Sequence, residues 1–181
     1  MRRVAAVVLA AGESARFGAP KQRLLLPTVL ARLHEAPVDE IVVVEGAHEL
    51  RPCDDRSRGL PCRVVRCPDW ERGPGASLRC GLAALADDVE AAIVVLADGP
   101  DLAPASVARV LDGWRSVGGI VAASYAGARG HPLVLGRAQW RDVPDEGLHE
   151  RPARLVPCDD LGAPGDVDEP DDLPPGLRVE G

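Results

Sequence analysis

The sequence predicts an α/β protein, in which a mostly parallel β-sheet has helices on both faces. Short apolar runs of strand type alternate along the chain with stretches whose apolar residues recur at helical spacing. This alternation is typical of strand–helix–strand units. The first run, residues 4–9, is apolar throughout, as expected for a strand that is covered on both faces.

Six strands and three helices are expected along the chain. Each predicted strand is a run rich in valine, isoleucine, leucine or alanine, and the run at 91–97 is the strongest. The strands are expected at residues 4–9, 41–44, 63–66, 91–97, 120–123 and 132–135. The helices are expected at residues 28–34, 76–86 and 104–117. The last helix opens with Pro104, which suits the first helical position.

A chain of this length and composition fits one globular domain. It has 181 residues, of which 46% are hydrophobic and 27% are charged, so it can bury a sizeable core. We expect one domain over residues 1–181. Proline and glycine become dense after Leu161, so the end of the chain should be mainly loop. A short helical turn is expected at residues 169–170, and residues 174–181 should form a loop-like tail.

The composition argues against membrane and nucleic-acid partners. No apolar run approaches the roughly 18 residues that cross a bilayer. The first apolar stretch breaks at Gly12, too soon for a signal peptide, so a cytoplasmic protein is expected. The net charge of −7 does not suit a nucleic-acid binder, which would carry a basic face.

The five cysteines indicate free thiols. Their number is odd and no Cys-x-x-Cys pair occurs, so in a cytoplasmic protein free thiols are favoured over disulfides or a zinc site.

One lysine stands among 21 basic residues, and it lies in a small-residue loop after the first predicted strand. Such a loop lets backbone N–H groups approach a phosphate closely, and Arg16 and Lys21 could neutralise a polyanion. Lys21 is followed by Gln22, so the loop is not a P-loop, and Gly12 and Gly18 do not fit a dinucleotide fingerprint. Spacing alone leaves open an ordinary surface lysine.

Two acidic segments are candidate metal ligands. Asp98 follows the strongest predicted strand, where an acid can hold Mg²⁺ on the phosphates of a nucleotide. For the nearby Asp101 a turn or helix cap is favoured. In the acidic stretch 166–172, Asp168 could be a second ligand or part of an acidic helical turn, and for Asp171 and Asp172 the turn is favoured.

Two further segments have weaker signals. The glycine-rich turn 72–76 enters a predicted helix, and Ser77 either faces a nucleobase or simply caps the helix. His131, in a Gly-His-Pro turn, is more often structural than catalytic.

Together these segments resemble the MobA-like nucleotidyltransferases, and most closely their molybdenum cofactor cytidylyltransferase branch. The similarity covers about residues 4–173, and its segments keep the order of the family. The matching segments are the loop 9–22, the Gly-Ala-Ser-Leu-Arg-Cys-Gly-Leu stretch 75–82, the Leu-Ala-Asp-Gly-Pro stretch 96–100, the Arg-Gly-His-Pro-Leu-Val-Leu stretch 129–135 and the acidic stretch 166–173.

The resemblance implies a doubly wound, Rossmann-like three-layer fold and a Mg²⁺-dependent transfer of a nucleoside monophosphate. A phosphate on the acceptor would attack the α-phosphorus of an NTP, and pyrophosphate would leave. That nucleophile is already ionised, so catalysis would rest on positioning and charge neutralisation. CTP is favoured by the Ala10-Ala11-Gly12 opening. The implied acceptor is a small phosphorylated molecule such as molybdopterin, and a molybdoenzyme is a possible partner.

The resemblance also implies roles for single residues. Arg16, Lys21 and Asp98 would be catalytic, Asp98 and Asp168 would hold the metal, and His131 would lie on the acceptor side. The nucleotide would be held by Leu9, Ala10, Ala11, Gly12, Arg16, Lys21 and Ser77.

Four departures from the family pattern leave alternatives open. A segment after Leu26 is several residues short, Gly99 replaces glutamine, Glu169 replaces threonine, and residues 139–154 differ throughout. A nucleotide-binding accessory protein without turnover, or a guanylyltransferase with another phosphorylated acceptor, would also fit.

Overall fold

Seven strands form one mixed sheet in the computed structural model, which describes residues 3–51 and 60–177. The order across the sheet is β3-β2-β1-β4-β6-β5-β7. The strands are β1 (Arg3–Ala10), β2 (Glu40–Glu45), β3 (Cys62–Arg66), β4 (Val89–Leu96), β5 (Ile120–Tyr125), β6 (Ala128–Gly136) and β7 (Arg154–Pro157). Only β6 runs antiparallel to its neighbours, β4 and β5. The mostly parallel sheet is therefore confirmed.

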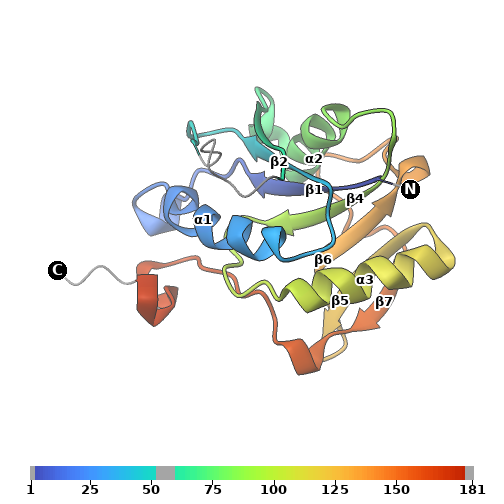
Figure 1. Cartoon of the computed structure of the whole chain (residues 1–181). Coiled ribbons are helices and arrows are strands. Elements are labelled where there is room, and N and C mark those ends of the chain that lie inside the picture. Colours follow the sequence, from blue (N-terminus) through green and yellow to red (C-terminus); the bar gives the residue numbers. More distant parts are fainter. Residues whose placement is uncertain (1–2, 52–59, 178–181) are drawn as a thin grey trace.

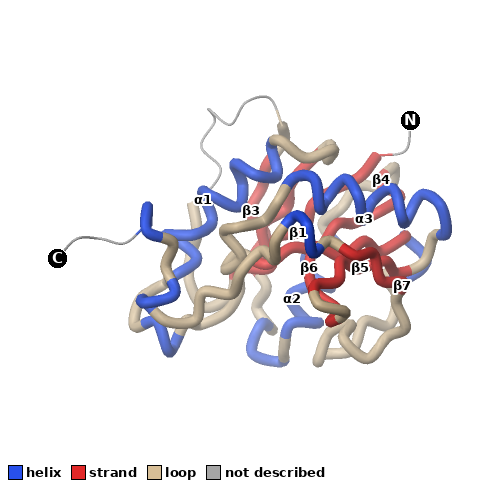
Figure 2. The backbone as a smooth tube through the Cα atoms, turned by 90° about the horizontal axis from the view of Figure 1, so that it is seen from below, coloured by secondary structure: helices blue, strands red, loops and turns tan. Residues whose placement is uncertain are grey.

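Three helices cover the two faces of this sheet, as Figures 1 and 2 show. They are α1 (Lys21–His34), α2 (Pro74–Ala83) and α3 (Pro104–Val117). Side chains of α1 and α3 pack in one apolar cluster with alternate residues of β1, β2 and β4, whereas α2 packs on the opposite face. The expected three-layer, Rossmann-like arrangement is confirmed. No helix in residues 3–51 and 60–177 is long and apolar enough to cross a membrane.

The direction in which the chain adds strands reverses at the centre of the sheet, between β1 and β4. From β1 the chain builds outward through α1 to β2 and β3, and it then returns through α2 to β4 on the other side of β1. The loops that follow β1 and β4 consequently diverge, and such a switch point is where open α/β sheets bind ligands.

The first helix differs most from the expectation. It begins at Lys21, seven residues before the predicted start, and it passes through Pro27 without ending. Pro27 lies on the exposed side of the helix, while Leu25, Leu26 and Val29 are buried. The buried stripe stabilises the helix across the proline, which alone would disfavour it. The missing family segment after Leu26 thus leaves a continuous helix.

Two further expectations need correction. The short edge strand β7 was not predicted, and Cys62, at the start of β3, is disulfide-bonded. An odd number of cysteines prevents complete pairing but not the pairing of two. Cys53 lies outside the described residues, and Cys67, Cys80 and Cys158 are free. In the described part of the expected tail, residues 174–177, the chain forms the 3₁₀ turn Pro175–Leu177.

Helix α2 lies so close to the sheet that one position excludes a side chain. A Cβ added at Gly81 would meet Val7 Cγ1 at 2.5 Å and Val44 Cγ2 at 2.9 Å. These valines are short, fully buried side chains, so they cannot swing away without opening the core.

We therefore expect Gly81→Ala to destabilise the fold by about 1–2 kcal/mol, because the clash outweighs the higher helix propensity of alanine. Urea unfolding measures the change. Gly176→Ala is the control, since a Cβ there meets nothing within 4 Å. A Gly81→Ala protein as stable as the original would contradict the close packing of α2.

Candidate active site

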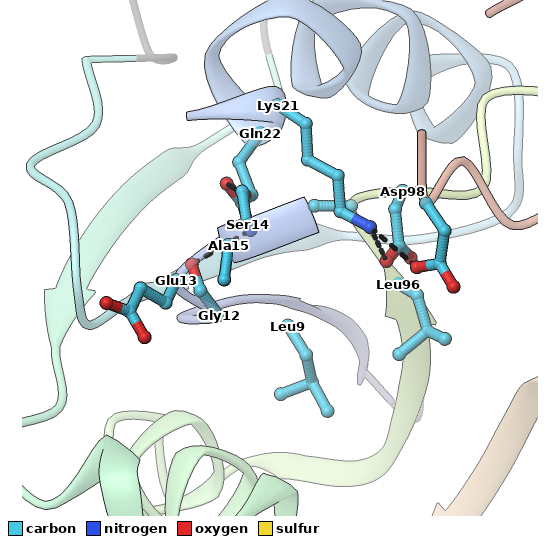
Figure 3. Close-up of a pocket in the computed structure, with 11 residues that line it drawn as sticks. Leu9, Gly12, Glu13, Ser14, Ala15, Lys21, Gln22, Leu96 and Asp98 are labelled. Atoms are coloured by element: carbon cyan, nitrogen blue, oxygen red, sulfur yellow. Dashed lines mark hydrogen bonds and ion pairs between the residues drawn. The ribbon is translucent and has the colours of Figure 1, made fainter. Parts of the chain in front are cut away.

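A pocket of about 380 Å³ lies at the switch point, between the loops that follow β1 and β4. Five of the residues expected at the site line it: Leu9, Gly12, Lys21, Asp98 and Asp168. They come from the end of β1, the loop after it, the start of α1, the turn after β4 and the C-terminal segment. Figure 3 shows most of them around the cavity.

The Lys21 ammonium lies between two carboxylates in this pocket. Its Nζ is 3.1 Å from an oxygen of Asp98 and 3.3 Å from an oxygen of Asp168. It also donates a hydrogen bond of 2.5 Å to the backbone oxygen of Val167. The lysine side chain is only 8% exposed, so its charge needs these partners. In Figure 3 the ammonium points to the Asp98 side of the pocket.

The loop after β1 is held by side chains of its own segment. Ser14 has a φ of 59° and Gly18 a φ of 73°, and these left-handed residues bracket the 3₁₀ turn η1 (Ala15–Phe17). Gln22 donates from Nε2 to the Gly12 oxygen at 3.0 Å, and its amide oxygen accepts from the Ser14 hydroxyl at 2.6 Å. The loop is therefore anchored to the first turn of α1.

The C-terminal segment is fastened to the turn after β4. The Val167 N–H donates to the Asp98 backbone oxygen at 3.1 Å, and one carboxylate oxygen of Asp172 accepts from the N–H groups of Asp168 and Glu169. The acidic turn expected at the end of the chain is confirmed as η5 (Pro170–Asp172), with Glu169 and Asp172 in a capping box. Asp168 is thus carried on an ordered backbone.

The structure gives a reason for one of two departures from the family pattern in this region. A Cβ at Gly99 would meet Pro164 at 3.1 Å, so the C-terminal segment occupies the space that a glutamine would need. Glu169 is the N-cap of η5 and forms a capping box with Asp172, a position that the threonine of the family pattern would also suit.

Several expected residues do not line this pocket. Ala10 and Ala11 are buried, and the Ala11 oxygen accepts from the Ala47 N–H at 3.0 Å. Ser77 is 4% exposed within α2 and is not its N-cap, which is Gly73. Arg16 belongs to η1, beside Ala15 of the pocket, but its side chain lies outside the described part of the structure.

A second cavity of about 420 Å³ is lined by the segment Arg129–His131 of β6. Its floor is apolar and includes Leu9 and Leu96, which also line the first pocket. The two cavities therefore share a wall. Apolar residues from β4, β6 and α2 complete the floor of the second one: Val94, Leu133, Pro74 and Leu78.

Arg129 and His131 place two titratable groups at the second cavity. The Arg129 guanidinium donates to the backbone oxygen of Arg151 at 2.7 Å, and its second terminal nitrogen is buried with no hydrogen-bond partner among the described residues. Burial lowers the pKa of Arg129. Burial, with the nearby Arg129 charge, also lowers the pKa of His131 to about 4, although Asp98 opposes this shift. His131 is therefore neutral at pH 7.

The remaining wall of the second cavity consists of Glu146, Gly147, Leu148 and His149. None of these was predicted as a site residue, although they lie in the stretch 139–154 that departs from the family pattern. The stretch is seated on α2: the Gly75 N–H donates to the Asp145 oxygen at 2.9 Å, and the Asp145 carboxylate pairs with Arg72 and Arg79. The N–H of Gly75 is thus already used and is not free to read a nucleobase.

Comparison with known proteins gives the family. The model of the MobA-like NTP transferase domain matches residues 6–156, while no curated protein gives a significant match. Rv0371c of Mycobacterium tuberculosis H37Rv is similar in structure, with a TM-score of 0.76 and 32% identity over 94% of this chain and 95% of that one.

A structure of Rv0371c described as a complex with manganese is also similar, with a TM-score of 0.64 and 25% identity over 86% of this chain and 88% of that one. A nucleotidyl transferase from Methanothermobacter thermautotrophicus shares the fold, with a TM-score of 0.70 and 23% identity over 95% and 94% of the two chains. The family match spans most of the sheet and every lining residue of the first pocket except Asp168. The chain therefore belongs to the MobA-like NTP transferase family and is a nucleotidyltransferase.

Proposed function

We propose that this single-domain enzyme transfers CMP from CTP to a small phosphorylated acceptor such as molybdopterin, with Mg²⁺, and releases pyrophosphate. The observation that carries the proposal is the pair of adjoining cavities. One holds a lysine and two carboxylates, the other is largely apolar, and Leu9 and Leu96 separate them. Two substrates bound on either side of this wall would meet at its edge.

The donor set of the first pocket suits Mg²⁺. Asp98 and Asp168 both lie within 3.3 Å of one cationic atom, Lys21 Nζ, so their oxygens converge on a point that favours positive charge. Mg²⁺ is often held by one or two carboxylates together with substrate phosphates and water. When bound there, the metal would neutralise charge on the phosphates of the nucleotide. The manganese complex of the related Rv0371c agrees with a divalent ion.

The residues of the chain would then act by placement and charge. Lys21 is the first residue of α1 and lines the pocket with Gly12 and Ala15. From there its flexible side chain can carry the ammonium to the phosphates. Arg16 would add a second positive charge. An acceptor phosphate needs no general base, so in-line alignment and stabilisation of the leaving pyrophosphate would provide the rate enhancement.

The second cavity would hold the acceptor. Its leucine and valine floor matches an acceptor with an apolar or flat body, and Arg129 offers a guanidinium whose described hydrogen bonds go only to backbone oxygens. His131 would contribute a neutral imidazole, which can donate or accept a hydrogen bond. The choice of CTP rests on the Ala10-Ala11-Gly12 opening, and the product would pass to a molybdoenzyme.

The function is tested by incubating the purified protein with each NTP, Mg²⁺ and candidate phosphorylated acceptors. Pyrophosphate release with CTP and molybdopterin is expected, and titration calorimetry is run in parallel. Release with GTP and another acceptor would replace the substrates in this proposal. Nucleotide binding with no release under any condition would favour an accessory protein and overturn the enzymatic proposal for this chain.

The metal site predicts opposite effects for two variants. Asp98→Asn should weaken Mn²⁺ binding by roughly tenfold or more, because a carboxylate ligand becomes a neutral amide. Lys21→Met should strengthen Mn²⁺ binding in the absence of nucleotide, because the competing ammonium is gone, and should weaken CTP binding.

Electron paramagnetic resonance of free Mn²⁺ measures the metal affinity without any turnover. Asp101→Asn is the matched control, since Asp101 lies in the same turn but does not line the pocket. Unchanged Mn²⁺ affinity in both variants would refute the assignment of Asp98 and Lys21.

The lowered pKa of His131 predicts how stability changes with pH. Between about pH 6.5 and 4 the unfolded chain binds a proton at this histidine and the folded chain does not. The free energy of unfolding should therefore fall as the pH drops through this range, by up to ~1.4 kcal/mol per pH unit from this group.

In His131→Gln this part of the fall should disappear, whereas His149→Gln, at an exposed wall residue, should keep it. Urea unfolding at several pH values measures the difference. Identical pH profiles for wild type and His131→Gln would show that His131 titrates normally.

A further inference from the structure

We propose that Cys67 and Cys80 form a disulfide bond, a covalent site outside the nucleotide and acceptor pockets. The two free thiols come from different elements. Cys67 follows β3, where its N–H donates to the Glu45 oxygen at 2.8 Å, and Cys80 lies on α2. Their sulfur atoms are 2.6 Å apart, near the bonding separation of about 2.05 Å.

The surroundings favour one bond between these two sulfurs over separate modification of each. Cys67 is fully buried in the cluster beneath α2, and Cys80 is partly exposed at its edge. An oxidant from solvent therefore reaches Cys80 first, and the sulfur nearest to the oxidised Cys80 is that of Cys67.

A low-molecular-weight disulfide such as oxidised glutathione can supply the oxidising equivalents. The Cys80 thiol loses its proton to solvent, and the thiolate attacks one glutathione sulfur and releases the other glutathione as a thiolate, which takes up a proton. The Cys67 thiol then loses its proton to solvent, and its thiolate attacks the Cys80 sulfur and expels the second glutathione as a thiolate, which takes up a proton. Two protein thiols are oxidised and one glutathione disulfide is reduced to two thiols.

The bond should form slowly and persist once formed. Burial and the neighbouring Cys67 raise the pKa of Cys80 to about 11, with Asp69 raising it further and Arg79 opposing. The thiolate that attacks is therefore scarce at neutral pH, and a thiol of high pKa is a poor leaving group when the disulfide is attacked. These properties are typical of a structural bond.

The bond would tie α2 to the edge of the sheet. Helix α2 lines the second cavity through Pro74 and Leu78 and carries Gly75, on which the stretch 139–154 is seated. Linking residue 80 of this helix to residue 67 closes a short loop around the 3₁₀ turn η2 (Trp70–Arg72). A loop of this length reduces the entropy of the unfolded chain.

Peptide mapping of the oxidised wild-type protein tests the bond directly. The full-length protein is incubated with oxidised glutathione at pH 8, quenched in acid, alkylated and digested with trypsin. The expected product joins the tryptic peptides 67–72 and 80–109, with a mass two hydrogens below their sum. The rate should rise about tenfold per pH unit between pH 7 and 9, as the thiolate fraction does.

Variants separate this bond from other thiol chemistry. Cys80→Ser and Cys67→Ser should each abolish the linked peptide, and Cys158→Ala should keep it. Oxidation should raise the melting temperature of wild type by roughly 5–10 °C and leave that of Cys80→Ser unchanged. Wild-type protein whose Cys67 and Cys80 remain alkylatable after oxidation, or which carries only a stable glutathione adduct on Cys80, would overturn the proposal.

Discussion

The parallel pairing of β1 with β4 is the constraint on which the other parts of this molecule depend. Apart from Arg3 and Glu90, both strands consist of alanine, valine, leucine and isoleucine, and both are covered by helices on two faces. The pairing brings Leu9 beside Leu96 in register, so the two loops that leave these strands begin side by side and then part. One loop leads to Lys21, the other carries Asp98, and the space between them is the first pocket.

In the first pocket Lys21 links the first loop of the chain to the C-terminal segment. A buried ammonium is costly unless it is paired, and Lys21 finds its partners in the turn after β4 and in the C-terminal segment. Lys21 thus faces two carboxylates in the pocket, those of Asp98 and Asp168. If the proposed metal binds there, these carboxylates would hold it beside the phosphates of the nucleotide, so binding of the metal and of the nucleotide would be linked.

The predictable parts of the fold are those with a strong local pattern. Helix α3 occupies the predicted residues, since Pro104 and a clear apolar stripe mark it, and the continuous apolar runs became central strands. The start of α1 was predicted too late. The sequence shows Pro27, which disfavours a helix, but it does not show that the leucines and the valine on either side of Pro27 are buried. The strand β7 was missed because its four residues are mostly exposed at a sheet edge and show no alternation.

The site divides in the same way. The motif segments made it possible to predict Lys21, Asp98 and Asp168 as site residues. Their ion pairs join residues far apart in the sequence and have no local signal. The wall formed by Glu146–His149 could not be predicted, since its place depends on the contact between Asp145 and the glycines at the start of α2.

The position of Asp168 in the sequence has a consequence for the newly made protein. Lys21, Asp98 and the central strands β1, β2 and β4 all lie within the first 98 residues of the chain. The second carboxylate arrives only when translation has added another 70 residues, which is the difference between 168 and 98. A nascent chain that exposes only its first 98 residues would therefore lack both C-terminal partners of Lys21, Val167 and Asp168.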